Sequence, residues 1–141
     1  MTGIGFDAPG VWRARGRGFS MALAAPEGRV LRFTGQVAWD EDERIVGRGD
    51  PAAQARRCFE NVERLLRVVG GDLGDVVEIT TWLTDAAHLP AVQKVRAEML
   101  TNEPQPVSTS VVVAALGHPD FLVELTPVAV IPHERFRDPR G

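Results

Sequence analysis

Apolar residues recur along the chain with two periods, one typical of helices and one typical of strands. The longest helical pattern follows Asp50-Pro51, where an aspartate that can cap free N–H groups precedes a proline suited to the first turn. Its apolar residues are three and four positions apart: Ala55, Cys58, Phe59, Val62, Leu65, Leu66 and Val69. Gly70-Gly71 ends this pattern, which predicts a helix with the Cys58 thiol packed on its buried side. A shorter pattern of the same kind, Leu89, Val92, Val95 and Met99, predicts a second helix over 89–100.

Five segments rich in β-branched or alternating apolar residues predict strands. They are residues 19–24, 29–33, 75–83, 107–116 and 121–131. A further strand at 37–39 is expected to form a hairpin with 44–46 around four consecutive acidic residues, Asp40 to Glu43. Those acids lack the internal glycine and the alternating ligand spacing of a calcium loop, so the pattern favours a solvated turn.

This order of elements predicts an α+β fold in a single domain spanning residues 1–141. Two amphipathic helices would cover one face of a mixed six-stranded sheet. The other face would keep apolar side chains that no remaining segment can cover, which predicts an oligomer. Residues 1–18 are rich in glycine and arginine and are expected to lead into the first strand rather than to bind nucleic acid, and residues 133–141 to form a polar tail.

Composition and charge narrow the classes of function. The 141 residues are 44% hydrophobic and 25% charged, which is typical of a globular chain that needs neither a disulfide nor a metal to hold its core. The net charge of −3 argues against a simple polyanion binder, and one cysteine with three histidines argues against a zinc cluster. Residues 1–20 lack the apolar core of a signal peptide, and the longest aliphatic run, 111–116, is far shorter than the ~20 residues that span a bilayer. We therefore expect a cytoplasmic protein without membrane contact, metal or cofactor.

Several short motifs follow one another in a recognisable order between about Phe19 and Val130. They are Phe33-Thr34-Gly35-Gln36, Ala52-Ala53-Gln54, Asn61-Val62, Asp75-Val76-Val77 with Thr80, Pro106, and Val123-Glu124-Leu125 with Ala129. In order and spacing together, they resemble the reactive-intermediate deaminase (Rid) family, also called YjgF-like and formerly L-PSP endoribonuclease.

The resemblance implies a chorismate-mutase-like fold and a homotrimer whose three sheets form a central β-barrel, with ligand sites in the clefts between subunits. Active members of the family hydrolyse short-lived 2-imino or 2-aminoacrylate-type acids to 2-keto acids and ammonia. Their sites supply an arginine that holds the substrate carboxylate, a glutamate that orients water, a backbone amide near a Ser/Thr-Gly step, and often a tyrosine. Arginine suits the binding of a carboxylate because its guanidinium can donate two parallel hydrogen bonds to the two carboxylate oxygens.

This chain matches the family's site only in part. Gly35 matches the glycine and Glu124 the glutamate, whereas Ser108 occupies the arginine position of the Pro-x-Arg-Ser/Thr motif. Ser110 stands where cysteine is common, and Phe19 corresponds to the tyrosine. The resemblance therefore implies a divergent member that lacks the catalytic arginine. Its implied site comprises catalytic Glu124 and the ligand-binding residues Phe19, Gly35, Ser108, Thr109 and Ser110. The residues that could supply a replacement cation are Arg13, Arg15, Arg17 and Arg32.

Other interpretations of these residues stay open. Glu124 could form an ion pair with an arginine of a neighbouring subunit, and the Ser108 and Thr109 hydroxyls could satisfy backbone groups. The leading functional hypothesis is a trimer that binds a small imine, enamine or carbonyl metabolite, with or without hydrolysing it. The second is a non-catalytic ligand-binding or regulatory trimer. An endoribonuclease is disfavoured by the acidic charge and by the absence of a His/Lys/Arg constellation for phosphodiester cleavage.

Overall fold

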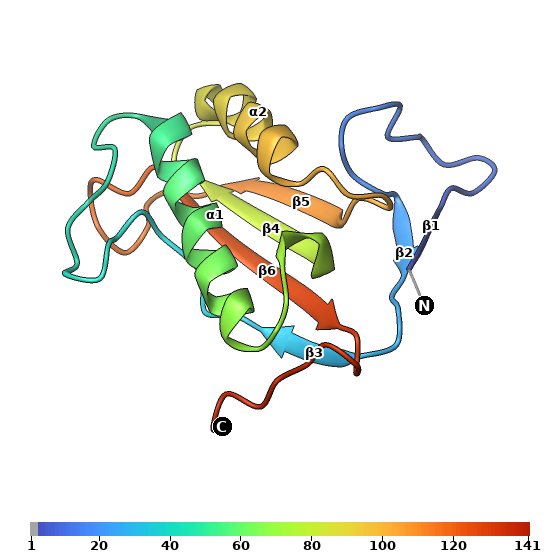
Figure 1. The fold of residues 1–141 in the computed structure, drawn as a ribbon. Helices are drawn as coiled ribbons and strands as arrows, with labels where there is room; N and C mark the ends of the chain where they lie inside the picture. The colour runs from blue at the N-terminus through green and yellow to red at the C-terminus, as the bar shows by residue number, and fades with distance from the viewer. Residues whose placement is uncertain (1–2) are drawn as a thin grey trace.

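The structure, a computed structural model, describes residues 3–141 and places two helices on one face of a four-stranded sheet (Figure 1). The strands are β1 (Ile4–Phe6), β2 (Ala22–Ala24), β3 (Arg29–Arg32), β4 (Val76–Leu83), β5 (Val107–Val112) and β6 (Val123–Ile131). The helices are α1 (Pro51–Val68) and α2 (Leu89–Met99), and short 3-10 turns at Leu73–Asp75 and Ala86–His88 precede β4 and α2. No helix among residues 3–141 has both the length and the apolar character needed to cross a membrane.

The four-stranded sheet has the order β3-β6-β4-β5, in which β4 and β5 are parallel and the other neighbours are antiparallel. The predicted α+β class, with a mixed sheet and two helices on one face, is confirmed. The prediction that six strands share one sheet is corrected, because β1 and β2 form a separate antiparallel pair with Ile4 opposite Ala24. This pair lies beyond the β5 edge of the main sheet (Figure 1).

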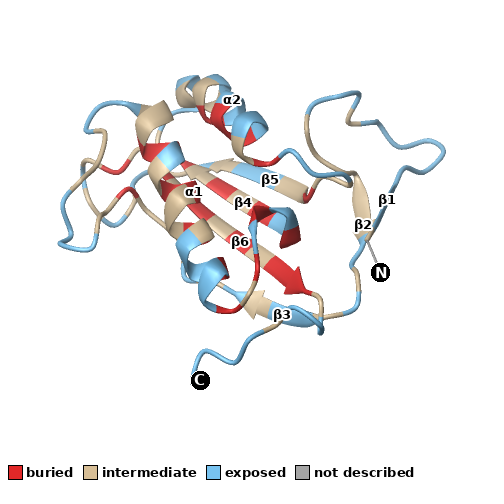
Figure 2. Ribbon diagram, viewed as in Figure 1, coloured by how far each residue is buried: buried red, intermediate tan, exposed pale blue. Residues whose placement is uncertain are grey.

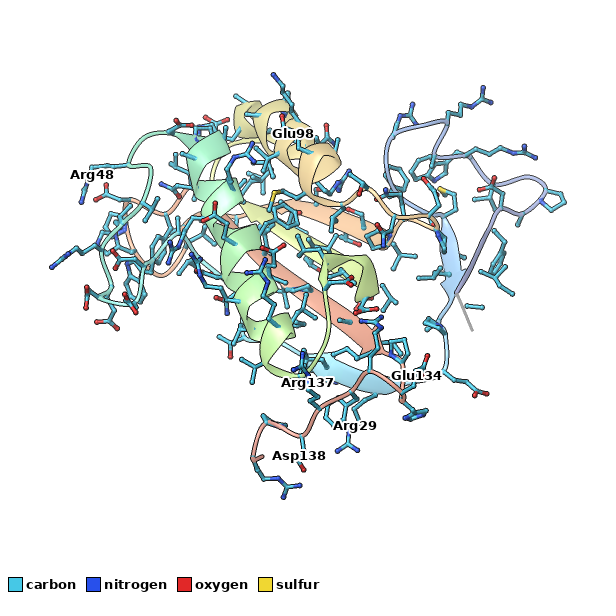
Figure 3. All side chains as sticks on the ribbon, viewed as in Figure 1. Arg29, Arg48, Glu98, Glu134, Arg137 and Asp138 are labelled. Carbon is cyan, nitrogen blue, oxygen red and sulfur yellow. The ribbon has the colours of Figure 1, made fainter. Side chains whose placement is uncertain are left out.

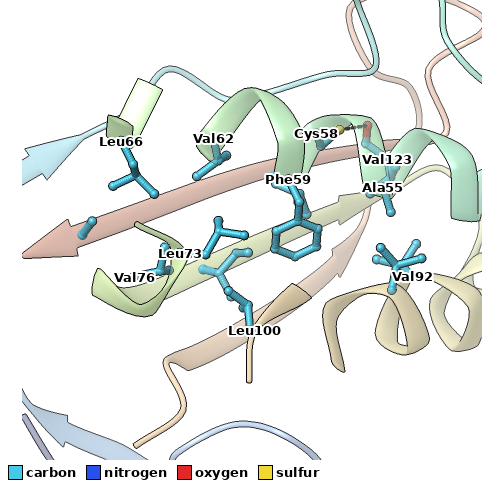
Figure 4. Close-up of a cluster of buried hydrophobic side chains, with 14 of the residues drawn as sticks. Ala55, Cys58, Phe59, Val62, Leu66, Leu73, Val76, Val92, Leu100 and Val123 are labelled. Atoms are coloured by element: carbon cyan, nitrogen blue, oxygen red, sulfur yellow. Dashed lines mark hydrogen bonds between the residues drawn. The ribbon is translucent and has the colours of Figure 1, made fainter. Parts of the chain in front are cut away.

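The core lies between the helices and the sheet, as the periodicity of α1 predicts. Asp50 caps α1 by accepting a hydrogen bond from the Ala53 amide at 3.1 Å. Ala55, Cys58, Phe59, Val62 and Leu66 are buried against β4 and β6, whereas Leu65 is 45% exposed and lies outside the stripe (Figures 2 and 4). Each large side chain buried here contributes about 1.5–3 kcal/mol to the free energy of folding.

Several predicted strands are shorter in the structure: the strand predicted at 19–24 begins only at Ala22, and the strand predicted at 121–131 begins at Val123. Two other segments show why. The expected hairpin at 37–46 is reduced to a single bridge between Trp39 and Ile45, because the Asp40 carboxylate accepts hydrogen bonds from the Asp42 and Arg44 amides and holds the segment in a turn. The strand expected to reach residue 116 ends at Val112, since its partner β4 ends at Leu83 and offers no further backbone groups for pairing.

The two terminal segments are more ordered than the sequence predicts. Of the expected lead-in, residues 1–18, the first two lie outside the described residues, and residues 3–18 contain β1. In the expected polar tail, Phe136 packs against the core and the Arg137 amide donates a hydrogen bond to the Val69 carbonyl at 2.9 Å. Arg29 lies over the Phe136 ring, and Figure 3 shows Arg29, Arg137 and Asp138 gathered beside the C-terminal segment. The tail is polar in composition, yet it docks on the domain through the Phe136 ring and through hydrogen bonds from Arg135 and Arg137.

Candidate functional site

Glu124 and Gly35 lie against each other at one end of the sheet. The Gln36 amide donates to the Leu125 carbonyl at 2.7 Å and the Leu125 amide donates back at 2.9 Å, which fixes the segment after β3 beside β6. A Cβ atom at position 35 would collide with the Glu124 carboxylate, so this close approach requires glycine.

The Glu124 side chain is half-buried on the sheet face that the helices leave open. On β4 it is paired with Trp82, whose indole Nε1 donates to the Thr126 hydroxyl at 3.0 Å. Burial raises the pKa of Glu124, and no basic side chain in residues 3–141 forms an ion pair with it to oppose that shift. The carboxyl group therefore holds a proton to higher pH than an exposed glutamate does.

The open face carries a mixture of side chains rather than the apolar surface that the sequence predicts. Threonines from β4, β5 and β6 lie among valines, one tryptophan, one arginine and two glutamates. The residues on this face are Val30, Arg32, Glu78, Thr80, Trp82, Val107, Thr109, Val111, Glu124, Thr126, Val128 and Val130. Both helices lie on the other face of the sheet (Figure 1).

A broad cavity of about 780 Å³ opens beside Gly35, between the segment after β3 and helix α1. Asn61 orders this segment by donating to the Val37 and Trp39 carbonyls at 3.2 and 3.1 Å. Arg57 and Arg64 also line the cavity, and the buried Nε of Arg57 has no hydrogen-bond partner in residues 3–141. The sequence analysis singled out neither arginine as a site residue.

Ser108 lies on the opposite face of the sheet from Glu124. It pairs with Ile79, which is buried beneath the helices, so the Ser108 side chain points toward the helical layer. There its Oγ accepts a hydrogen bond from Arg96 at 2.7 Å. Arg96 lies on α2, is only 5% exposed, and also donates to the Arg17 carbonyl at 3.4 Å. An arginine therefore lies beside the serine that stands in the family's arginine position.

None of the four arginines proposed from the sequence reaches Ser108 with its guanidinium. Arg17 contributes only its carbonyl, because its own guanidinium donates to the Arg13 carbonyl and lies over the Trp12 ring. Arg15 and Arg32 are exposed to solvent. Arg96 was missed, although one signal was present: it stands four residues after buried Val92 and so falls on the apolar side of its helix.

The sequence-predicted site residues form two groups in the structure. Ser108 and Thr109 line a cavity of about 210 Å³ together with Phe19. Gly35 and Glu124 form the second group, two strands away. Glu124 shares the open face with Thr109 and lies on the opposite face from Ser108. Along the strands the groups are separated by about 10 Å, three residues at ~3.3 Å each. Ser110 is exposed and lines neither of the two cavities.

Cys58 takes no part in either group. Its Sγ lies 4.0 Å from the Val123 carbonyl oxygen, and burial raises the pKa of the thiol to about 12. A thiol that stays protonated at neutral pH is a poor nucleophile. The prediction that Cys58 is a packed core residue is confirmed.

Comparison with known families identifies the relatives of this fold and site. The family model described as Endoribonuclease L-PSP matches residues 14–131. The chain belongs to this family, the Rid family. Among solved structures, the Rid protein YyfB from Yersinia pestis, of unknown function, superposes with a TM-score of 0.82 at 28% identity and covers 93% of this chain and 100% of its own. RidA from the Antarctic bacterium Psychrobacter sp. has a TM-score of 0.67 at 30% identity, covering 90% and 94%.

Relatives by sequence include a protein named as a deaminase. The 3-aminoacrylate deaminase RutC from Acinetobacter baylyi is 36% identical over 100 residues, which are 71% of this chain and 78% of RutC. The protein DfrA from Myxococcus xanthus is 32% identical over 112 residues, 79% of this chain and 84% of DfrA. The membership of the Rid family that the ordered motifs predict is confirmed. The relative named as a deaminase indicates an imine-deaminase type of family.

Proposed function

We propose that this protein is a trimeric Rid-type deaminase that hydrolyses a small 2-imino or 2-aminoacrylate-type acid to a keto acid and ammonia. The observation that carries the proposal is the Glu124 carboxylate, which is half-buried, lacks an ion-pair partner within residues 3–141, and lies against Gly35. The 36% identity to a protein named 3-aminoacrylate deaminase supports the same class of reaction.

The reaction requires a group that moves a proton from water to nitrogen. In its ionised form Glu124 accepts a proton from water as the water oxygen bonds to the C=N carbon. That proton passes to the nitrogen as the C=N π bond breaks, which gives the carbinolamine. Glu124 then accepts the carbinolamine hydroxyl proton as the C=O bond forms and passes it to the nitrogen, so that the C–N bond breaks and ammonia leaves. Burial raises the pKa of Glu124, which makes the carboxylate a stronger base for the first step. Contact with Gly35 restricts where the carboxylate can lie and so helps to orient the water.

In this proposal a second copy of the chain completes the site. One small ligand cannot touch both Glu124 and Ser108 of the same copy, because they face opposite sides of the sheet. In a trimer with a central β-barrel, the β5 edge of one copy would lie beside the open face of the next. Phe19, Ser108, Thr109 and exposed Ser110 would then approach Glu124 and Gly35 across the interface.

The reaction is tested by coupling the protein to an amino-acid oxidase and following the loss of the 2-imino acid. We expect the protein to accelerate this loss over buffer for at least one of several amino acids. No acceleration with any of them would contradict deamination. That result would favour the second candidate, a non-catalytic ligand-binding trimer, which the serine at position 108 also favours.

The assembly is tested by size-exclusion chromatography with light scattering. The trimer should have three times the 15.4 kDa mass of the chain, about 46 kDa. A monomer at micromolar concentration would contradict a site shared between copies.

A further inference from the structure

Arg96 is a buried cation without a counter-charge. Its side chain is 5% exposed, and no carboxylate of residues 3–141 lies within ion-pair distance. Burial lowers the pKa of Arg96, and no acidic side chain of residues 3–141 lies close enough to oppose this shift. A buried guanidinium is unfavourable unless an anion or several hydrogen bonds compensate it, yet an arginine remains charged at neutral pH. The surroundings of Arg96 therefore lack a negative group.

The contact with Ser108 shows where such a group would bind. A guanidinium has only donors, so the Ser108 oxygen accepts the 2.7 Å hydrogen bond from Arg96. The hydroxyl hydrogen of Ser108 remains free to donate to a third atom. Because Ser108 lines the cavity of about 210 Å³, its hydroxyl can donate into that cavity with the positive charge of Arg96 directly behind it.

The size and walls of this cavity limit its occupant. At about 210 Å³ it lies below the ~300–1,000 Å³ range of pockets for drug-sized ligands, so it suits a molecule of a few heavy atoms. Phe19 and Trp12 supply aromatic surface, and Thr109 supplies another hydroxyl. Glu78 also lines the cavity, but its side chain is exposed. Solvent screens that charge more strongly than the buried charge of Arg96.

We infer that Arg96 and Ser108 together form a binding subsite for the carboxylate of a small organic acid. The carboxylate accepts the Ser108 hydroxyl hydrogen and is held by the positive charge of Arg96. As part of the deaminase site this assignment rests on the proposed function, but carboxylate binding can be measured without turnover. Arg96 acts through Ser108 in this arrangement and is a positioning residue.

The test uses pyruvate as the probe and pyruvamide as its uncharged match, with binding to the full chain measured by calorimetry at low ionic strength. We expect the wild-type protein to bind pyruvate more tightly than pyruvamide. Arg96→Met and Ser108→Ala should each weaken pyruvate binding about tenfold or more and leave pyruvamide binding unchanged. Arg67→Met, which removes an exposed arginine paired with Glu63, is the matched control and should bind pyruvate as the wild type does.

Two results would overturn the subsite: equal affinity of the wild type for the two probes, or unchanged pyruvate binding in Arg96→Met. If Arg96→Met does not fold, Ser108→Ala decides the question, because it removes only the hydroxyl and keeps the buried arginine. The outcomes also separate the two proposals. Pyruvate binding that depends on Arg96 in a protein without turnover supports the subsite and contradicts the deaminase, whereas full turnover in Arg96→Met contradicts the subsite alone.

Discussion

Glu124 and Arg96 are charged side chains of opposite sign, and each lacks an ion-pair partner within residues 3–141. Glu124 is half-buried on the open face of the sheet, where Gly35 leaves space for its carboxylate. Arg96 is an almost completely buried residue of α2, and it contacts a serine hydroxyl and a backbone carbonyl.

The difference between them is chemical as well as positional. A carboxyl group can respond to burial by holding a proton, and burial raises the pKa of Glu124. A guanidinium stays charged at neutral pH, so burial of Arg96 leaves a permanent positive charge. The first group suits proton transfer and the second suits the binding of a fixed negative charge. Each of the following predictions tests one side of this comparison.

Removal of the proton acceptor should have the largest effect. In Glu124→Gln we expect turnover in the oxidase-coupled assay to fall about 100-fold or more, because the amide cannot accept a proton from water. Glu27→Gln, an exposed glutamate in the turn between β2 and β3, should keep wild-type turnover. If Glu124→Gln keeps most of its activity, Glu124 is not the catalytic base.

Displacement of the same carboxylate should have a smaller effect. The added methyl group of Gly35→Ala would collide with the Glu124 carboxylate and shift it from its position, so we expect turnover to fall about 10- to 100-fold. The melting temperature should change little, since the colliding atoms lie at the end of a flexible side chain. Gly117→Ala, where an added Cβ meets no atom within 4 Å, is the matched control. Equal turnover in the two variants would contradict a role for the close approach.

The stability of two arginine variants compares a paired cation with an unpaired one. Arg135 forms two hydrogen bonds with the buried Asp75 carboxylate, at 3.0 and 2.5 Å. Arg135→Met leaves that carboxylate without its partner and should lower the unfolding free energy by about 2–3 kcal/mol. Arg96→Met removes a buried charge that has no acidic partner and should change it by less than ~1 kcal/mol. Urea denaturation measures both, and an equal loss in the two variants would contradict the expected difference between a paired and an unpaired arginine.

The pH dependence of stability should show the smallest effect. Because its pKa is raised, Glu124 holds a proton in the folded protein at pH values where it is ionised in the unfolded chain. The folded state then binds more protons, so this residue's contribution to the unfolding free energy falls as pH rises from about 4. The melting temperature of Glu124→Gln should be slightly above that of the wild type at pH 7. This difference in melting temperature should disappear below about pH 4. A variant less stable than the wild type at pH 7 would contradict the raised pKa.

The sequence predicted those features that depend on local pattern. Three- and four-residue spacing predicted α1 and the buried thiol of Cys58, and ordered motifs indicated Gly35 and Glu124. Strand preference wrongly predicted a full hairpin at 37–46. The Asp40 carboxylate accepts hydrogen bonds from two backbone amides and holds the segment in a turn instead. The end of β5 depends on where β4 ends, which is a property of the sheet.

Arg96 shows why the candidate site was only partly predictable. In the sequence it is one of two basic residues in α2, and only the apolar pattern of Val92 and Val95 indicates which side of the helix is buried. Its contact with Ser108 joins two elements through the tertiary fold, so neither segment reveals it alone. The motif identified the serine as the position that departs from the family pattern. The structure supplied the arginine beside it.

The most direct test of the account is complementation between two inactive variants. If Glu124 of one copy acts with Arg96 and Ser108 of the next, a mixture of Glu124→Gln and Arg96→Met chains contains some interfaces with both native residues. After co-refolding in equal amounts, the mixture should recover about a quarter of the wild-type turnover, which is the fraction of such interfaces expected from random assembly of a cyclic trimer. Mixed trimers with no more activity than the separate variants would contradict a site shared between copies.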